Sequence, residues 1–178
     1  RRLAANDPLL KKQITSELGC VTPVMIVPGD YSPTELRFLA ENIASQVTNN
    51  ASFNCNAAKI VVVSEGWTQR DAFWQLLRDV LAEVPPRIAY YPGAQDRFAT
   101  LTAGKDKALR LGQATPDRLP WTMIRGLDPA AKNEPLFSTE PFCSILSEVA
   151  LTEREPAAFL TAAAAFARRA PSRCTFSP

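Results

Sequence analysis

Ile60-Val61-Val62-Val63 (IVVV, residues 60–63) is the stretch that decides the fold. All four residues are β-branched and apolar, and Gly66 follows closely enough to end the segment. Strands in parallel sheets are buried on both faces and read as unbroken apolar runs, whereas half-exposed strands alternate between apolar and polar residues. The stretch therefore predicts a fully buried strand.

The segment before this strand has the pattern of a capped helix. Ser32 is a candidate N-cap, Pro33 suits the first helical position, and Glu35 completes a capping box. Apolar residues then recur at helical spacing, namely Leu36, Leu39, Ala40, Ile43 and Val47. Asn49-Asn50 is expected to end this helix.

Two further helices are predicted downstream by the same signals. Thr68 with Asp71 opens the first, which carries an apolar stripe and cannot continue past Pro85-Pro86. Thr152 opens the second with Glu155 as its capping-box partner. A shorter helix is expected from residue 94 to about residue 103.

The other predicted strands complete an alternating pattern of strands and helices. They are Val21–Val27, Arg87–Tyr91, Trp121–Arg125 and Cys143–Leu151, and residues 104–119 read as loop and short helical pieces. Strands that alternate with helices indicate a three-layer α/β/α sandwich with a largely parallel sheet.

Composition narrows the classes of function. The 178 residues, 46% of them hydrophobic, can bury one sizeable core, so we expect a single domain over residues 1–178. The net charge of +2 is scattered and no apolar stretch approaches the roughly 20 residues of a membrane span, so neither nucleic acid nor membrane is an expected partner. The absence of histidine excludes Cys/His zinc sites, Ser-His-Asp triads and Cys-His dyads within this chain.

The four cysteines and the first residues bear on the setting of the protein. The cysteines lie far apart at positions 20, 55, 143 and 174 without a CxxC pair, and we expect reduced thiols in a cytoplasmic protein. The chain begins Arg1-Arg2 without a methionine or an apolar signal segment, and we expect it to be a fragment of a larger two-domain protein.

Cys55 and Glu17 are the residues most suited to chemistry. Cys55 stands between a predicted helix and a buried strand, where catalytic side chains are often displayed, although an isolated cysteine is more often a small buried apolar residue. Glu17 leads into the strand Val21–Val27, where partial desolvation suits a general base. A surface carboxylate paired with Lys11-Lys12 is the alternative. The residues alone leave both questions open.

Three motifs resemble those of the aldehyde dehydrogenase superfamily. Residues 17–24 (ELGCVTPV) resemble Glu-Leu-Gly-Gly-Lys-Ser-Pro, whose Glu is the general base, and residues 50–59 (NASFNCNAAK) are similar to Asn-x-Gly-Gln-x-Cys, whose Cys is the nucleophile. Residues 140–146 (EPFCSIL) resemble Glu-x-Phe-Gly-Pro-Val-Leu, whose Glu holds a cofactor ribose and whose Phe packs near the nicotinamide. The three motifs occur in the family's order, so the resemblance implies the catalytic domain of such an enzyme.

The resemblance implies a mechanism, a cofactor and partners. Cys55 would attack an aldehyde to give a thiohemiacetal, NAD or NADP would accept the hydride, and Glu17 would activate the water that hydrolyses the thioester. Glu140, Phe142 and Leu18 would contact the cofactor, which would be bound mainly by a domain outside this chain. The expected partners are a small aldehyde and, in the full protein, further copies of itself.

The departures from these motifs cluster at the site itself. Cys20, Ser52 and Cys143 stand where the family has glycine, and a side chain at such places is expected to narrow the cofactor or substrate channel. A degenerate, inactive binding or assembly module is therefore the alternative function, and it predicts that Cys55 is buried. Cofactor-free thioesterase or esterase chemistry is a minor alternative. Cys143 is expected either to be an ordinary buried thiol or to pair with Cys55 or Cys20.

Overall fold

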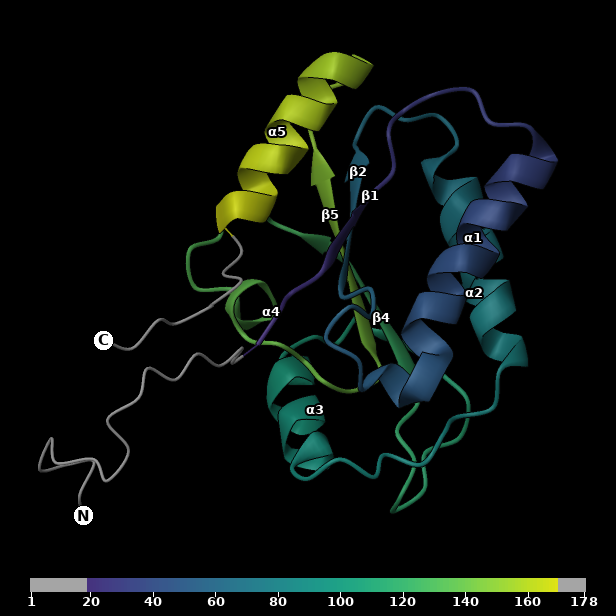
Figure 1. The fold of residues 1–178 in the computed structure, drawn as a ribbon, viewed down its shortest axis with the longest axis vertical. Coiled ribbons are helices and arrows are strands. Elements are labelled where there is room, and N and C mark those ends of the chain that lie inside the picture. The colour runs from purple at the N-terminus through teal and green to yellow at the C-terminus, as the bar shows by residue number, and fades with distance from the viewer. Residues whose placement is uncertain (1–18, 170–178) are drawn as a thin grey trace, which may run out of the picture.

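The computed structural model describes residues 19–169 and contains a five-stranded sheet in the order β1-β2-β5-β4-β3 (Figure 1). The strands are β1 (Pro23–Met25), β2 (Ile60–Ser64), β3 (Leu109–Leu111), β4 (Trp121–Leu127) and β5 (Ile145–Leu151). β1, β2, β5 and β4 are mutually parallel, and β3 alone pairs antiparallel, with β4. The predicted largely parallel sheet is confirmed.

Helices cover both faces of the sheet. They are α1 (Pro33–Thr48), the 3-10 turn η1 (Asn49–Ser52), α2 (Arg70–Glu83), α3 (Ala94–Thr102), α4 (Pro135–Ser138) and α5 (Pro156–Arg169). α1 and α2 lie side by side on one face of the sheet, and α5 lies on the other face (Figure 1). α3 and α4 lie below α5 in this view. The predicted three-layer α/β/α sandwich is confirmed.

The IVVV stretch explains why two cores form. Ile60 and Val62 belong to the core that includes α5, whereas Val61 and Val63 belong to the core beneath α1 and α2. Successive side chains of a strand point to opposite faces, so a strand covered on both sides needs apolar residues at every position. All five residues of β2 are buried, as the sequence predicts.

The first helix is capped as predicted. The Glu35 backbone N–H donates to Ser32 Oγ, and the Ser32 backbone N–H donates to Glu35 Oε2 at 2.8 Å, which closes the capping box. The helix ends at Thr48, one residue before Asn49-Asn50. The helix therefore ends just before the segment that carries Cys55.

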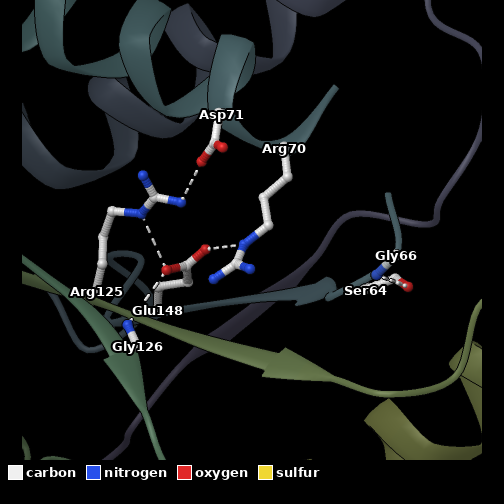
Figure 2. A network of polar contacts seen from close by, with 7 residues as sticks. All are labelled: Ser64, Gly66, Arg70, Asp71, Arg125, Gly126 and Glu148. Carbon is white, nitrogen blue, oxygen red and sulfur yellow. Dashed lines mark hydrogen bonds and ion pairs between the residues drawn. The ribbon is translucent and has the colours of Figure 1, made fainter. Parts of the chain in front are cut away.

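A buried carboxylate ties the α2 layer to the sheet. Glu148, in the middle of β5, accepts hydrogen bonds from Arg70 Nε at 2.7 Å, Arg125 Nε at 3.1 Å and the Gly126 N–H at 3.3 Å (Figure 2). Arg125 also donates to Asp71 at the start of α2. The network joins β4, β5 and α2.

Two sequence predictions about strands are wrong. Arg87–Tyr91 is not a strand and makes only an isolated bridge between Ile88 and Arg118, because no neighbouring strand runs beside it. Residues 104–119, predicted as loop and short helical pieces, contain the antiparallel edge strand β3. Only its pairing with β4 defines β3, since three residues carry too little periodicity to reveal it.

Other predicted segments have the right type with shifted bounds. Val21–Val27 and Cys143–Leu151 shorten to β1 and β5, Trp121–Arg125 lengthens to β4, and the last two long helices begin at Arg70 and Pro156 rather than at Thr68 and Thr152. No helix among residues 19–169 is long and apolar enough to cross a membrane.

Candidate active site

The three motifs converge because of the sheet topology. The first and third motifs run into the first residues of β1 and β5, and the second ends just before β2. These three strands are parallel neighbours. The amino ends of parallel neighbours lie at the same edge of a sheet, so residues that are far apart in sequence meet there. Cys20, Cys55 and Cys143 all lie at this edge.

Cys55 lies in the turn between η1 and β2, with an exposed side chain. Its backbone carbonyl accepts a 2.8 Å hydrogen bond from Thr22 Oγ1, and Thr22 Oγ1 also lies 3.3 Å from Cys20 Sγ. The first motif therefore holds the turn that carries the predicted nucleophile. The burial of Cys55 expected for an inactive module is wrong.

The turn that precedes Cys55 is left-handed. Asn50, Ala51 and Ser52 have φ values of 51°, 53° and 69°, a region that residues with a Cβ rarely occupy. The family motif places glycine at the position of Ser52, and here serine takes the conformation that favours glycine. Ser52 therefore adopts a left-handed conformation although it is not a glycine.

Lys59 is the buried cation of the site, with 1% of its surface exposed. Its Nζ donates to Ser52 O at 2.8 Å and to Ser52 Oγ at 3.2 Å, and it lies 5.9 Å from the centre of the Phe142 ring. Burial lowers the pKa of Lys59 from 10.5 to about 8. Four groups oppose that shift electrostatically: Glu140, Cys143, Cys20 and Cys55.

The first and third motifs meet at Gly19. A Cβ placed on Gly19 would lie 3.4 Å from Glu140 Oε2 and 3.7 Å from Glu140 Cβ, so the carboxylate packs against the glycine. Two residues further on, Phe142 is half-buried and left-handed, with a φ of 42°. Glu140, one of the residues predicted to contact the cofactor, therefore lies beside the segment that leads into β1.

An aromatic cluster adjoins Lys59. Phe142 packs against Tyr91 and Phe53, with ring centres 4.6 and 5.7 Å apart, and Phe53 also contacts Tyr90. The Tyr90 hydroxyl donates to Asn50 Oδ1 at 3.0 Å. Tyr90 and Tyr91 keep 60% and 44% of their surface exposed. The site therefore has an aromatic wall that borders solvent.

The three thiols at the site differ in their surroundings. Cys143 is fully buried, and burial raises the pKa of its thiol to about 12 although Lys59 and Arg97 oppose the shift. Cys20 is half-buried and Cys55 is exposed, and all three are free. The interpretation of Cys143 as an ordinary buried thiol is confirmed, and Cys55 is the thiol that solvent reaches most readily.

Two of the predicted site residues, Glu17 and Leu18, lie outside the described residues. The structure brings together Cys55, Glu140 and Phe142 and adds two cations, Lys59 and Arg97. Lys59 was visible in the sequence only as a basic residue after Cys55. Arg97 had no sequence signal, because its contacts with the third motif depend on how α3 packs.

Comparisons with known proteins agree on the fold. No protein-family profile and no curated protein sequence matches this chain. Among solved structures, it resembles an NAD-dependent aldehyde dehydrogenase from Sinorhizobium meliloti, with a TM-score of 0.70 and 21% identity over 94% of this chain and 34% of that one.

The fold is that of an aldehyde dehydrogenase domain. A betaine aldehyde dehydrogenase from Staphylococcus aureus in complex with NAD⁺ gives a TM-score of 0.68 at 16% identity, over 93% of this chain and 34% of that one. An NADP-dependent glyceraldehyde-3-phosphate dehydrogenase from Bacillus halodurans C-125 gives 0.63 at 16% identity, over 89% and 34%. This chain spans about a third of each of these aldehyde dehydrogenase-fold proteins.

Proposed function

We propose that this chain is the catalytic-domain part of an NAD(P)-dependent aldehyde dehydrogenase, in which Cys55 is the nucleophile. The observation that carries the proposal is the meeting of the three motifs at one edge of the sheet, with the exposed Cys55 thiol close to the cation of Lys59. The fold shared with several aldehyde dehydrogenases supports it.

The chemistry begins at the thiolate of Cys55. Its sulfur forms a bond to the aldehyde carbon, and the carbonyl oxygen takes up the negative charge. Loss of the aldehyde hydrogen as hydride, which NAD or NADP would accept when bound, would leave a thioester on Cys55. Water activated by Glu17 then attacks the thioester carbon, which releases a carboxylic acid and regenerates the thiol.

The residues at the site fit a nicotinamide cofactor in part. Glu140 offers a carboxylate that can accept from ribose hydroxyls, and Phe142 offers a half-buried ring beside it. NAD or NADP supplies the hydride acceptor when bound. This chain would bind a ribose through Glu140 and pack Phe142 near the nicotinamide ring. The remaining contacts would come from sequence outside this chain.

The test uses the parent protein, in which this chain is joined to its remaining sequence. With an aldehyde and NAD⁺ or NADP⁺, the absorbance of the reduced cofactor should rise, and Cys55→Ala should lower kcat/KM by at least about 10³-fold. The variant should bind the cofactor as the wild type does, which locates the loss in the chemical step. A parent protein that binds neither cofactor would contradict the proposal.

A further inference from the structure

Backbone strain is concentrated at this site. Among residues 19–169, the only non-glycine residues with positive φ are Asn50, Ala51, Ser52 and Phe142. They form two segments, one leading to Cys55 and one adjoining Glu140. Such residues are strained and persist only where surrounding contacts enforce them. The contacts that enforce them here are therefore of functional interest.

Lys59 holds the first segment. Its Nζ donates to both the carbonyl and the hydroxyl of Ser52, the last residue of the left-handed turn. The Lys59 backbone is itself fixed on two sides, because its N–H donates to Thr22 O at 3.0 Å and its carbonyl accepts from the Ser147 N–H at 2.9 Å. The cation therefore acts from a rigid position between the strand neighbours of β2.

Arg97 of α3 holds the second segment in the same way. Its Nε donates to Pro141 O at 3.0 Å and its Nη2 donates to Phe142 O at 3.2 Å. The third nitrogen, Nη1, donates to Pro92 O at 3.0 Å, and the guanidinium lies 5.8 Å from the centre of the Tyr91 ring. A planar group with donors in a fixed fork suits this task better than an ammonium does.

The aromatic cluster links the two segments. Phe53 follows the left-handed turn directly, Phe142 belongs to the other segment, and Tyr91 packs against both rings. A shift of either segment would therefore separate rings that now lie 4.6–5.7 Å apart.

We propose that Lys59 and Arg97 are positioning residues: by donating to the carbonyls of Ser52 and Phe142, the two cations hold the left-handed segments that present Cys55 and Glu140 to one site. Neither residue forms or breaks a bond. Any effect of these residues on cofactor binding rests on the proposed function, whereas their role in holding the two backbone segments does not.

The backbone is tested first, by amide hydrogen exchange of the parent protein. Lys59→Met should speed exchange in peptides covering residues 49–55 by about tenfold, and Arg97→Met should do so in residues 139–144. Arg118→Met is the matched control, because the Arg118 side chain also donates to a proline carbonyl, that of Pro86, which belongs to neither segment. It should change neither peptide. Unchanged exchange in both Lys59→Met and Arg97→Met would overturn the proposal, whether or not the parent protein is a dehydrogenase.

The consequence for the site is tested by the reactivity of each part. Lys59→Met should slow iodoacetamide alkylation of Cys55 by about tenfold, since the thiolate loses a neighbouring positive charge and a fixed turn, and it should leave the dissociation constant for NAD⁺ within about twofold. Arg97→Met should raise that dissociation constant about tenfold and leave alkylation of Cys55 unchanged, and Arg97→Lys should lie between. Equal effects of both variants on both readouts would overturn the separate roles.

A rescue separates positioning by Lys59 from its charge alone. Glycine adopts a left-handed conformation without strain, so Ser52→Gly should restore most of the alkylation rate lost in Lys59→Met. A double variant as slow as Lys59→Met would overturn the positioning role of Lys59. If no cofactor bound to the wild type, the proposed function would fail, while the exchange and rescue experiments would still decide this inference.

Discussion

Lys59 and Glu148 are both fully buried charged side chains, but the balance between burial and partner groups that sets their pKa values is opposite. Burial would raise the pKa of Glu148, but hydrogen bonds from Arg70 and Arg125 lower it below its ordinary value of 4.5. For Lys59 burial wins, and the pKa falls to about 8. The buried charge of Glu148 is compensated by its partners, whereas the buried charge of Lys59 is compensated only in part.

This difference teaches where the protein tolerates an electrostatic cost. Glu148 joins β4, β5 and α2, and its ionised form is the one that its arginine partners stabilise (Figure 2). Lys59 instead donates two hydrogen bonds to Ser52, beside an exposed thiol. Strongly shifted pKa values and strained backbone tend to gather at functional sites. The contrast between the two charges therefore supports the proposal that the functional site lies at the Lys59 end of the sheet.

The largest expected effect comes from breaking the compensated charge. Glu148→Gln should lower the free energy of unfolding by about 3–5 kcal/mol, because two arginines lose their buried anion. Native-state hydrogen exchange of β2 and β5 amides in the parent protein measures this quantity for this region. The control is Glu41→Gln, whose exposed pair with Arg37 should contribute less than about 1 kcal/mol. Equal losses in the two variants would show that Glu148 is no more important than a surface pair.

A pH series sharpens the comparison, because the two charges titrate in different windows. The folded pKa of Glu148 lies below its unfolded value of 4.5, so its contribution is present above pH 4.5 and is lost as the pH falls through the folded pKa. The folded pKa of Lys59, about 8, lies below 10.5, so the unfolded state binds more protons between these values and stability rises with pH there. Over that window the rise is worth at most about 3 kcal/mol, and it should vanish in Lys59→Met. A rise that persists in the variant would contradict the assignment.

The smallest effect is expected at the rim of the Glu148 network. Asp71 pairs with Arg125, yet 88% of its side chain is exposed. Asp71→Asn should therefore change the free energy of unfolding by less than about 1 kcal/mol, and 0.5 M NaCl should remove most of the difference. A loss comparable to that of Glu148→Gln would mean that burial does not decide which partner matters.

Much of the fold followed from local sequence patterns. The unbroken run at residues 60–63 predicted the buried strand, and Ser32 with Glu35 predicted the start of α1, because these signals depend on neighbours in the chain. β3 did not follow, since three residues become a strand only through pairing with β4. Arg87–Tyr91 has the composition of a strand, but among residues 19–169 it has no strand beside it to pair with and therefore does not form one.

The site was predictable through its motifs and not through its supports. Cys55, Glu140 and Phe142 were named because their segments resemble family motifs, and the sheet topology then brings them to one edge. The left-handed conformation of Ser52 and the hydrogen bond from Arg97 to the Phe142 carbonyl depend on tertiary packing. No local pattern encodes them. The roles of Cys55 and Glu17 stay predictions.

The most direct test of the central claim is the free energy of unfolding of Lys59→Met at pH 7, measured by hydrogen exchange of β2 amides in the parent protein. If Lys59 is a buried charge kept for the site at a cost to stability, removal of that charge should raise the free energy of unfolding by about 1 kcal/mol, after the loss of its hydrogen bonds to Ser52 is allowed for. A fall of 3 kcal/mol or more, as expected for Glu148→Gln, would show that Lys59 is a structural charge like Glu148 and would contradict the account.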